Sequence, residues 1–235
     1  MKSLAVIVAR GSSKRLPRKN LKKIGGYSIV QWVAKAALNS KIQDVVISTE
    51  DKEITNHGEK VGLKSLFTRP KHLTKDFALD LDILLHAVNQ CEKKLNKKYD
   101  VVCYIQPTTP FLRSADINKC LDKLKRKKLS CVFTSKNVSE HPKLMWKYKK
   151  NFLSPILKEK IKPEEQFFQK LEKTYLPNGG IWCMKLKEIK KQKTLYADPI
   201  DTIIVPSKFS VDIDNEEDLI LAKINMKKYN IKVEN

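Results

Sequence analysis

The first two thirds of the chain repeat one pattern, in which a short apolar run precedes a polar loop and then apolar positions at helical spacing. The apolar runs predict buried strands at Leu4–Ala9, Asp44–Thr49, Leu63–Phe67, Val101–Ile105 and Cys131–Thr134. Apolar residues three and four positions apart predict helices over Ser28–Asn39, Lys52–Lys60, Asp80–Leu95 and Ala115–Lys127. Because strands alternate with helices, we expect an α/β fold of three layers, with a mostly parallel, Rossmann-like sheet.

This pattern is interrupted between residues 137 and 175. Met145–Tyr148 and Phe152–Leu153 flank the charged tip Lys149-Lys150-Asn151, and this arrangement predicts a β-hairpin. We expect residues 137–175 to form a small arm inserted into a single domain of residues 1–235. An arm of this kind is suited to packing on a second subunit, so we expect a homodimer.

The α/β pattern returns toward the C-terminus. It predicts strands at Gly180–Met184 and Thr202–Val205 and a final helix over Asn215–Lys228. Asn215 is a good N-cap, and the acidic residues that follow it favour the positive end of the helix dipole.

Composition narrows the class of protein. A chain of 235 residues with 41% hydrophobic content is long enough for one sizeable α/β domain. No apolar run approaches the ~18 residues of a membrane-spanning helix. The five cysteines form no C-x-x-C pair, which is typical of reduced thiols in a cytoplasmic protein.

The formal net charge of +21 raises the question of a nucleic-acid partner. Only six of the 47 basic residues are arginine, although arginine is preferred for bidentate recognition of phosphates and bases. An RNA-binding module would also interleave basic patches with exposed aromatic residues. Trp32, Phe133 and Trp182 lie instead within apolar patterns. We therefore interpret the charge as a lysine-rich surface, and expect neither a nucleic-acid nor a membrane partner.

The loop after the first strand is the strongest candidate for chemistry. Its small residues, Gly11–Ser13, allow the backbone to approach an anion closely, and successive amides there can form an anion site. Five cations lie within ten residues, a density that suits a triphosphate and a leaving pyrophosphate: Arg10, Lys14, Arg15, Arg18 and Lys19. The loop matches neither G-x-x-x-x-G-K-[ST] nor G-x-G-x-x-G.

Asp212 and Asp214 form an acidic pair near the end of the chain. In an extended segment, residues i and i+2 point to the same face, so both carboxylates can reach one cation. Mg²⁺ prefers oxygen ligands and bridges carboxylates to phosphates. The alternative, in which one of the two aspartates only caps the next helix, is weaker because Asn215 can supply the cap.

Six segments together give the chain a specific resemblance. The first is A-R-x-x-S-K-x-x-P-x-K-N over residues 9–20. The others follow in order: Ser48-Thr49-Glu50-Asp51, Arg69-Pro70 with Leu73, Asp76 and Asp82, Gln106-Pro107-Thr108-Thr109-Pro110, Pro177-Asn178-Gly179-Gly180, and Asp212-Ile213-Asp214 with Glu217-Asp218-Leu219. Over residues 4–222 the chain resembles the acylneuraminate (CMP-sialic acid) synthetase family.

The resemblance implies a fold of the nucleotide-diphospho-sugar transferase type and transfer of CMP from CTP to the anomeric hydroxyl of an acidic 2-keto sugar. It also implies roles for individual residues. The nucleotide would be bound by Arg10, Ser13, Lys14, Lys19, Asn20, Arg69 and Asp82, with Asp82 at the ribose. Lys19, Arg10 and Asp214 would be catalytic, Gln106 would face the sugar, and Asp212 and Asp214 would bind Mg²⁺.

Three departures from the family pattern concern the sugar side. Sialate-type members carry arginines where this chain has Leu176 and Phe168, and an extra residue before Arg113 shifts that arginine. We therefore expect the acceptor to be sialic acid, a related nonulosonic acid or another acidic sugar. Lys143, beside Glu140-His141-Pro142, is a candidate for binding its carboxylate. A synthetase for the eight-carbon sugar Kdo and a sugar 1-phosphate nucleotidyltransferase remain the alternative enzymes.

Overall fold

The computed structural model describes residues 1–126, 128–157, 162–163 and 167–234. At its centre lies a six-stranded sheet of order β10-β6-β9-β5-β1-β4. β9 runs antiparallel to its neighbours β5 and β6, and the other pairings are parallel. The strands are β1 (Ser3–Val8), β4 (Asp44–Ser48), β5 (Val101–Ile105), β6 (Cys131–Asn137), β9 (Tyr175–Lys185) and β10 (Ile200–Ile204). The mostly parallel sheet expected from the sequence is confirmed.

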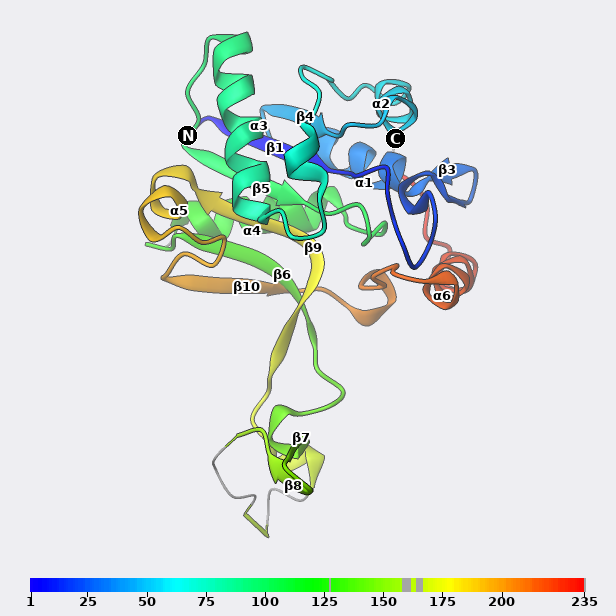
Figure 1. The fold of residues 1–235 in the computed structure, drawn as a ribbon, viewed down its shortest axis with the longest axis vertical. Helices are drawn as coiled ribbons and strands as arrows, with labels where there is room; N and C mark the ends of the chain where they lie inside the picture. Colours follow the sequence, from blue (N-terminus) through cyan, green and yellow to red (C-terminus); the bar gives the residue numbers. More distant parts are fainter. Residues whose placement is uncertain (127, 158–161, 164–166, 235) are drawn as a thin grey trace.

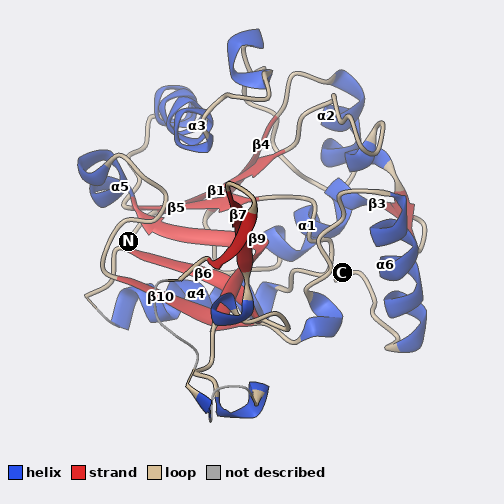
Figure 2. Cartoon of the chain, turned by 60° about the horizontal axis from the view of Figure 1, so that its bottom comes forward, coloured by secondary structure: helices blue, strands red, loops and turns tan. Residues whose placement is uncertain are grey.

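Helices cover both faces of the sheet, as Figure 2 shows. Alternation along β1 sends Ala5 and Ile7 into one core cluster and Leu4 and Val6 into the other. The first cluster packs against α1 (Ile29–Leu38) and α4 (Ser114–Arg126), with α2 (Lys52–Glu59) beside α1. The second packs against α3 (Asp80–Leu95) and α5 (Leu186–Gln192). The three-layer architecture follows from this alternation.

A third core cluster joins the two ends of the chain. Leu16 of the first loop, Trp32 of α1, Phe111 and Ile213 bury their side chains together against α6 (Glu216–Lys228). The short strands β2 (Lys23–Ile24) and β3 (Tyr27–Ser28) complete this layer. Asn215 caps α6, accepting from the Asp218 amide at 2.9 Å, as the sequence predicts. The cluster therefore holds the first loop close to the acidic pair.

The predicted hairpin is present as β7 (Trp146–Lys149) and β8 (Phe152–Pro155). Figure 1 shows it at the end of an arm that projects from the sheet on extensions of β6 and β9. Residues 158–161 and 164–166 of the expected arm lie outside the described residues. Short 3-10 helices complete the secondary structure: η1 (Lys19–Leu21), η2 (Lys71–Thr74), η3 (Pro142–Leu144), η5 (Phe168–Lys170) and η6 (Ser207–Phe209).

One expectation about a single element needs correction, and another falls outside the described residues. The predicted strand Leu63–Phe67 is reduced to one isolated bridge between Lys64 and Val46, although Leu63 and Phe67 are buried. Apolar side chains can enter the core from irregular backbone, so burial alone does not imply a ladder of hydrogen bonds. The predicted end of α4 at Lys127 lies outside the described residues. Within the described ranges, no helix has the length and apolar character that crossing a membrane requires.

Candidate active site

A cavity of ≈ 370 Å³ lies at the carboxyl ends of β1 and β5, where ligands bind in open α/β sheets. Four chain segments line this main cavity: the first loop, residues 69–83, Gln106–Thr108 and the acidic pair. A smaller cavity of ≈ 260 Å³ is lined by Ser12–Arg15 and adjoins it, since Arg10, Lys19, Asn20, Asp76 and Asp214 line both. Together they form one continuous site with a cationic side and an acidic side.

The two sides meet at Lys19 and Asp214, which are 195 positions apart in the sequence. The Lys19 Nζ lies 2.9 Å from Asp214 Oδ1, and an Arg15 guanidinium nitrogen lies 2.9 Å from Asp214 Oδ2. Lys19 is held in place by η1, where its amide donates to the Leu16 carbonyl at 3.1 Å. Leu16 is itself buried in the third core cluster. The convergence required by the resemblance is therefore built into the core.

Four of the five cations of the first loop line the site, and the fifth does not. Arg10 and Lys14 each place a nitrogen 2.6 Å from a carboxylate oxygen of Asp76. Hydrogen bonds from Lys14 and Arg10 lower the pKa of Asp76 below its usual range. Arg18 pairs instead with Asp51 and with Glu53 at 2.5 Å. Asp76 thus forms ion pairs with two cations, Arg10 and Lys14, that are suited to binding an anionic ligand.

The amide of Gly11 is not free to bind an anion, contrary to the expectation that successive amides of Gly11–Ser13 form an anion site. Its N–H already donates to Glu50 Oε1 at 2.7 Å. A Cβ at this position would lie 2.4 Å from Asp51 Oδ2, so glycine is needed for space beside Asp51. The side chains of the loop, rather than the Gly11 amide, are therefore left to bind an anion.

Asn20 and Arg69 form the buried floor of the main cavity. The Asn20 Nδ2 donates to the Arg10 carbonyl at 2.9 Å, whereas its buried Oδ1 has no partner. Leaving a buried acceptor unsatisfied costs about 1–3 kcal/mol, which a ligand N–H or O–H would offset. Arg69 is 3% exposed and donates from Nε to Ser48 Oγ at 3.1 Å. Burial lowers the pKa of Arg69, and the charge of Glu50 only partly opposes this.

The structure places Asp82 outside the lining of the main cavity. Asp82 is exposed on α3 and is not among the residues that line the main cavity, whereas Asp80 is. Residues two positions apart on a helix point to nearly opposite sides, so only one of them can face the cavity. Asp80 accepts a hydrogen bond of 2.5 Å from the Tyr104 hydroxyl.

Asp212 and Asp214 both line the main cavity, and Ile213 between them is fully buried. This is the alternation expected of an extended segment. Surrounding protein raises the pKa of Asp212, and the charge of Asp214 raises it further. Partial burial would also raise the pKa of Asp214, but Lys19 and Arg15 outweigh that effect and lower it. The two aspartates therefore sit in different electrostatic environments.

This donor set fits Mg²⁺, because it offers carboxylate oxygens beside a cavity for phosphates. No group of three or more His, Cys, Asp or Glu side chains with metal-binding geometry occurs among the described residues. A cation held here would take only Asp212 and Asp214 from the protein. That is the usual arrangement for a metal whose other ligands are water and substrate phosphates.

The Pro177–Gly180 segment explains how Asp212 is positioned. Asn178 Oδ1 accepts from the Thr134 hydroxyl at 2.7 Å and from the Gly180 amide at 3.1 Å. Gly179 has φ +76°, and a Cβ there would lie 3.2 Å from Asp212 Oδ2 and 3.0 Å from a Thr109 oxygen. Only glycine adopts this conformation without strain and leaves room for the carboxylate.

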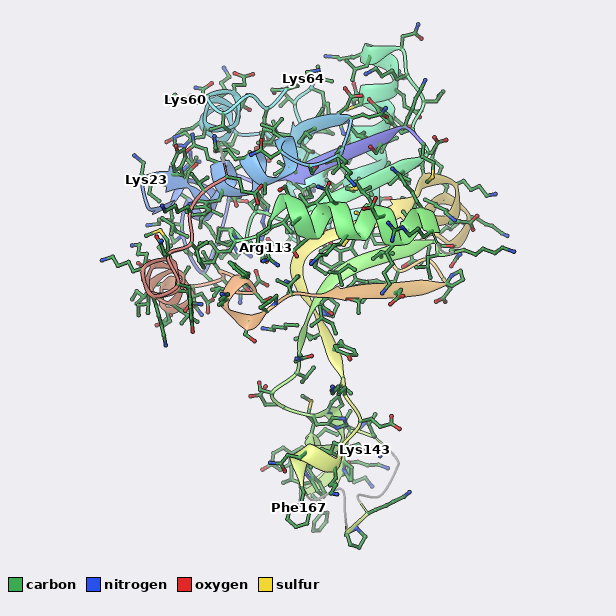
Figure 3. All side chains as sticks on the ribbon, turned by 180° about the vertical axis from the view of Figure 1, so that it is seen from behind. Lys23, Lys60, Lys64, Arg113, Lys143 and Phe167 are labelled. Carbon is green, nitrogen blue, oxygen red and sulfur yellow. The ribbon has the colours of Figure 1, made fainter. Side chains whose placement is uncertain are left out.

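The two candidate sugar-binding residues are placed very differently. Gln106 lines the main cavity at the end of β5. Lys143 belongs to η3 on the arm, and Figure 3 shows it well away from the body of the molecule. Within one chain the structure therefore does not bring Lys143 to the site. Sequence reasoning also left Arg15 and Asp76 without individual roles, although the charge density of the loop and the R-P-x-x-L-x-x-D motif pointed to their segments.

Comparison with known proteins agrees with this geometry. A family model described as cytidylyltransferase matches residues 4–172. The chain belongs to the cytidylyltransferase family. This cytidylyltransferase is 29% identical over 225 residues to the pseudaminic acid cytidylyltransferase of Campylobacter jejuni, covering 95% of this chain and 96% of that protein. It is 28% identical over 228 residues to the CMP-N,N'-diacetyllegionaminic acid synthase of Legionella pneumophila, covering 95% of each.

Two further similarities are more limited. The N-acylneuraminate cytidylyltransferase B of Danio rerio is 34% identical to this cytidylyltransferase over 130 residues, which are 55% of this chain and 29% of that protein. The structure of a CMP:2-keto-3-deoxy-manno-octonic acid synthetase complexed with CTP superposes with a TM-score of 0.69 at 19% identity, over 97% of this chain and all (100%) of that chain. The latter shows a common fold. The resemblance to acylneuraminate-type synthetases is confirmed, and the protein is a nucleotidyltransferase.

Proposed function

We propose that this protein transfers CMP from CTP to the anomeric hydroxyl of a nonulosonic acid, an acidic nine-carbon 2-keto sugar, and releases pyrophosphate. The observation that carries the proposal is the contact of 2.9 Å between Lys19 and Asp214. It brings the cationic loop and the acidic pair to one cavity, as attack on the α-phosphorus of a triphosphate requires. The relatives named for pseudaminic, legionaminic and N-acylneuraminic acids support the choice of acceptor class.

The residues of the site supply positioning and charge neutralisation, which dominate catalysis of phosphoryl transfer. Arg10, Ser13 and Lys14 bind the phosphates that leave, with Arg15 beside them. Lys19, only 13% exposed, stabilises charge that develops on the α-phosphate. The buried acceptor of Asn20 and the buried cation of Arg69 bind the rest of the nucleotide.

The reaction forms a bond between the anomeric oxygen and the α-phosphorus and breaks the bond to the β-phosphate oxygen. Pyrophosphate leaves with the electron pair of that bond. The hydroxyl proton passes to a carboxylate beside the reacting phosphorus, and we assign this role to Asp214. Mg²⁺, when bound, supplies positive charge against the phosphates. Asp212 and Asp214 would hold it, and Gln106 orients the acceptor.

We further propose that the enzyme acts as a cytoplasmic homodimer in which the arm packs on a second subunit. Trp146, Tyr148, Phe152 and Leu153 are exposed on the hairpin. Tyr148 lies opposite Leu153 and on the same face as Trp146, and grouped exposed apolar residues of this kind commonly form interfaces. In that assembly Lys143 would act on the partner's site rather than on its own. All five cysteines are buried and unpaired, which suits reducing surroundings.

The test is a pyrophosphate-release assay with CTP, Mg²⁺ and a panel of acceptors. The panel contains N-acetylneuraminic, pseudaminic and N,N'-diacetyllegionaminic acids, Kdo and a hexose 1-phosphate. We expect turnover with at least one nonulosonic acid, dependence on CTP over other nucleotides, and loss of activity with a chelator. Turnover with Kdo or the sugar 1-phosphate alone would favour the alternative enzymes. No turnover, together with salt-sensitive RNA retention, would favour a binding module.

A further inference from the structure

A further cavity, of ≈ 520 Å³, opens between the base of the arm and α6, and we call it the side cavity. It is lined by Lys136 of β6, Leu176 of β9, Lys208 of η6 and Tyr229 after α6, among other residues. Asp212 lines this side cavity as well as the main cavity. Asp212 thus belongs to the wall between the two cavities, and a ligand that reacts beside it can extend into both.

Lys136 is placed on this wall by the pairing of β6 with β9. Its direct partner across the antiparallel ladder is Leu176. Directly opposite residues of an antiparallel pair present their side chains on the same face. Lys136 and Leu176 therefore face the side cavity together, one as a half-buried cation and the other as an apolar neighbour.

The other cations near this cavity are already engaged. Arg113 forms two hydrogen bonds with the buried Asp116, at 2.7 and 2.8 Å, and lies 4.2 Å over the Phe209 ring. Figure 3 shows Arg113 on the body beside α6. The Lys208 ammonium lies over two rings, those of Phe209 at 5.0 Å and Tyr229 at 5.4 Å. Lys136, by contrast, forms no ion pair with any residue in the part of the chain that the structure describes. Its charge does reach Asp212, whose pKa it lowers against the larger effect of burial.

The chemistry of the acceptor requires a cation at this place. In a 2-keto acid sugar the anomeric carbon carries both the attacking hydroxyl and the carboxylate. When the hydroxyl is in line with the α-phosphorus, the carboxylate lies one carbon away, close to the negative charges of Asp212 and Asp214. Coulomb repulsion in a partly buried site would oppose binding unless a positive charge lies on the acceptor's side.

We propose that Lys136 binds the carboxylate of the acceptor sugar from the side cavity and so selects acidic 2-keto sugars. This inference rests on the function proposed above. The residue that binds the acceptor's carboxylate then lies on β6 of the same chain, whereas Lys143 lies on the distant arm. Lys136 lines neither the main cavity nor the smaller cavity of the first loop, where the nucleotide is proposed to bind.

The test measures steady-state kinetic parameters separately for the acceptor and for CTP. The acceptor is the nonulosonic acid that the wild-type protein turns over best. In Lys136→Ala we expect kcat/KM for the acceptor to fall about 10- to 100-fold, the loss typical of one charge-assisted hydrogen bond. The KM for CTP should stay within about threefold, because ground-state binding of the nucleotide is untouched. Lys136→Arg should retain most of the activity, since it keeps the charge.

Lys208→Ala is the matched control, because it removes a lysine that lines the same cavity but is held over two aromatic rings. It should change kcat/KM for the acceptor by less than about threefold, as expected for an exposed charge. A Leu176→Arg change in the Lys136→Ala background supplies a cation from the facing strand and should restore part of the lost activity. Both variants test whether a positive charge is needed at this one position. A general loss of structure would produce neither the small effect of Lys208→Ala nor the recovery with Leu176→Arg.

Each result bears on the proposal. An acceptor kcat/KM in Lys136→Ala within threefold of wild type, or an equal loss in Lys208→Ala, would overturn it and leave the proposed function standing. Equal losses in the acceptor and CTP parameters would also overturn it. Absence of pyrophosphate release by the wild-type protein with every acidic acceptor would overturn the proposed function and this assignment together.

Discussion

Asp44 and Asp214 lie at opposite ends of the sheet, and their surroundings differ in one instructive respect. Asp44, at the amino end of β4, is 5% exposed and accepts from the Tyr99 hydroxyl at 3.0 Å and the Lys97 Nζ at 2.8 Å. Lys64 lies 4.0 Å away. Every partner of this carboxylate belongs to the protein, and the cluster is complete without a ligand.

At the carboxyl ends of the sheet strands, by contrast, some polar groups have no protein partner. The Asn20 Oδ1 and Glu50 Oε2 atoms are buried there without partners. The buried Arg69 donates to Ser48 but forms no salt bridge with any described residue. Asp214 is half exposed, although it holds Lys19 and Arg15. Buried polar groups normally find partners. His86, Trp182 and Glu234 also carry a buried atom without one, so a missing partner alone does not mark a ligand site. Asn20 differs because it lines the main cavity, where a ligand can donate to it. The comparison separates a charged cluster that stabilises the fold from one that performs chemistry.

The largest expected effect comes from Asp214→Asn, which removes charge with little change in volume. We expect kcat for pyrophosphate release to fall by on the order of 10³, because a group that stabilises the transition state is lost. The melting temperature should shift little, since ion pairs of a half-exposed carboxylate contribute little to stability. Pyrophosphate release and thermal unfolding, measured on the same preparation, check both statements. Full activity in this variant would contradict the role assigned to the acidic pair.

Gly179→Ala tests whether the acidic end depends on backbone geometry. The new Cβ meets Asp212 and Thr109 at a residue with φ +76°, so either the strand or the carboxylate must shift. A displacement of catalytic groups by about 1 Å can cost roughly 10²-fold, and we expect a loss of kcat of that order. Gly26→Ala is the matched control: Gly26 also has positive φ, but its Cβ would meet nothing within 4 Å. Similar losses of activity in both variants would show that strain alone, and not contact with Asp212, is responsible.

Much of the fold was predictable because its helices are determined locally. The bounds of α3 match the predicted helix Asp80–Leu95, and Asn215 caps α6 as expected. The extent and direction of β9 were not predictable. Pro177 pairs with Ser135 in the ladder, whereas Asn178 and Gly179 lie in an irregularity of it where the register shifts. Hydrogen bonds of the Asn178 side chain with Thr134 and Ser210 hold this irregularity in place. Such contacts join residues far apart in the chain, and local spacing does not reveal them.

The candidate site shows the same division. Motifs in the first loop and around Asp212 indicated which segments meet, and the contact between Lys19 and Asp214 agrees with them. Asp80, and not Asp82, lines the main cavity, because the rotation of α3 about its axis decides which side chain faces it and the motif does not specify that rotation. Lys136 was missed because its position opposite Leu176 depends on strand register. Sequence identified the segments, and three-dimensional packing identified the individual side chains.

Asp44→Asn should produce the opposite pattern to Asp214→Asn. We expect a loss of about 2 kcal/mol in the free energy of unfolding, because Tyr99 and Lys97 lose a buried charged acceptor. Both residues lie far from the main cavity's lining, so kcat should remain near wild type. Urea unfolding followed by fluorescence measures the difference. Asp122→Asn, which breaks the exposed pair with Lys41 (3.3 Å), is the matched control and should cost under about 0.5 kcal/mol.

The contribution of Asp44 also has a defined pH dependence. Burial would raise the pKa of Asp44, but hydrogen bonds from Lys97 and Tyr99 outweigh it, so its folded-state pKa lies below the usual value. A lowered folded-state pKa stabilises the fold fully above the unfolded value of about 3.9, and this stabilisation is lost as the pH falls through the folded-state pKa. The stability difference between wild type and Asp44→Asn should thus be constant near neutral pH and shrink below about pH 4. A difference that grows on acidification would contradict this account.

The smallest expected effect concerns Asp76, which shares features of both ends. It is paired with Arg10 and Lys14, as a structural carboxylate would be, but it is exposed and holds cations assigned to the triphosphate. Asp76→Asn should therefore release them and lower the KM for CTP by about two- to fivefold, the modest effect of an exposed ion pair. The gain should diminish at high ionic strength, because salt screens the pairs that the substitution removes. Kinetics at two salt concentrations, with Asp122→Asn as the control, measure it. If the KM for CTP rises instead, Asp76 positions Arg10 for the nucleotide rather than competing with it, and it belongs with Asp214 among the groups that perform chemistry.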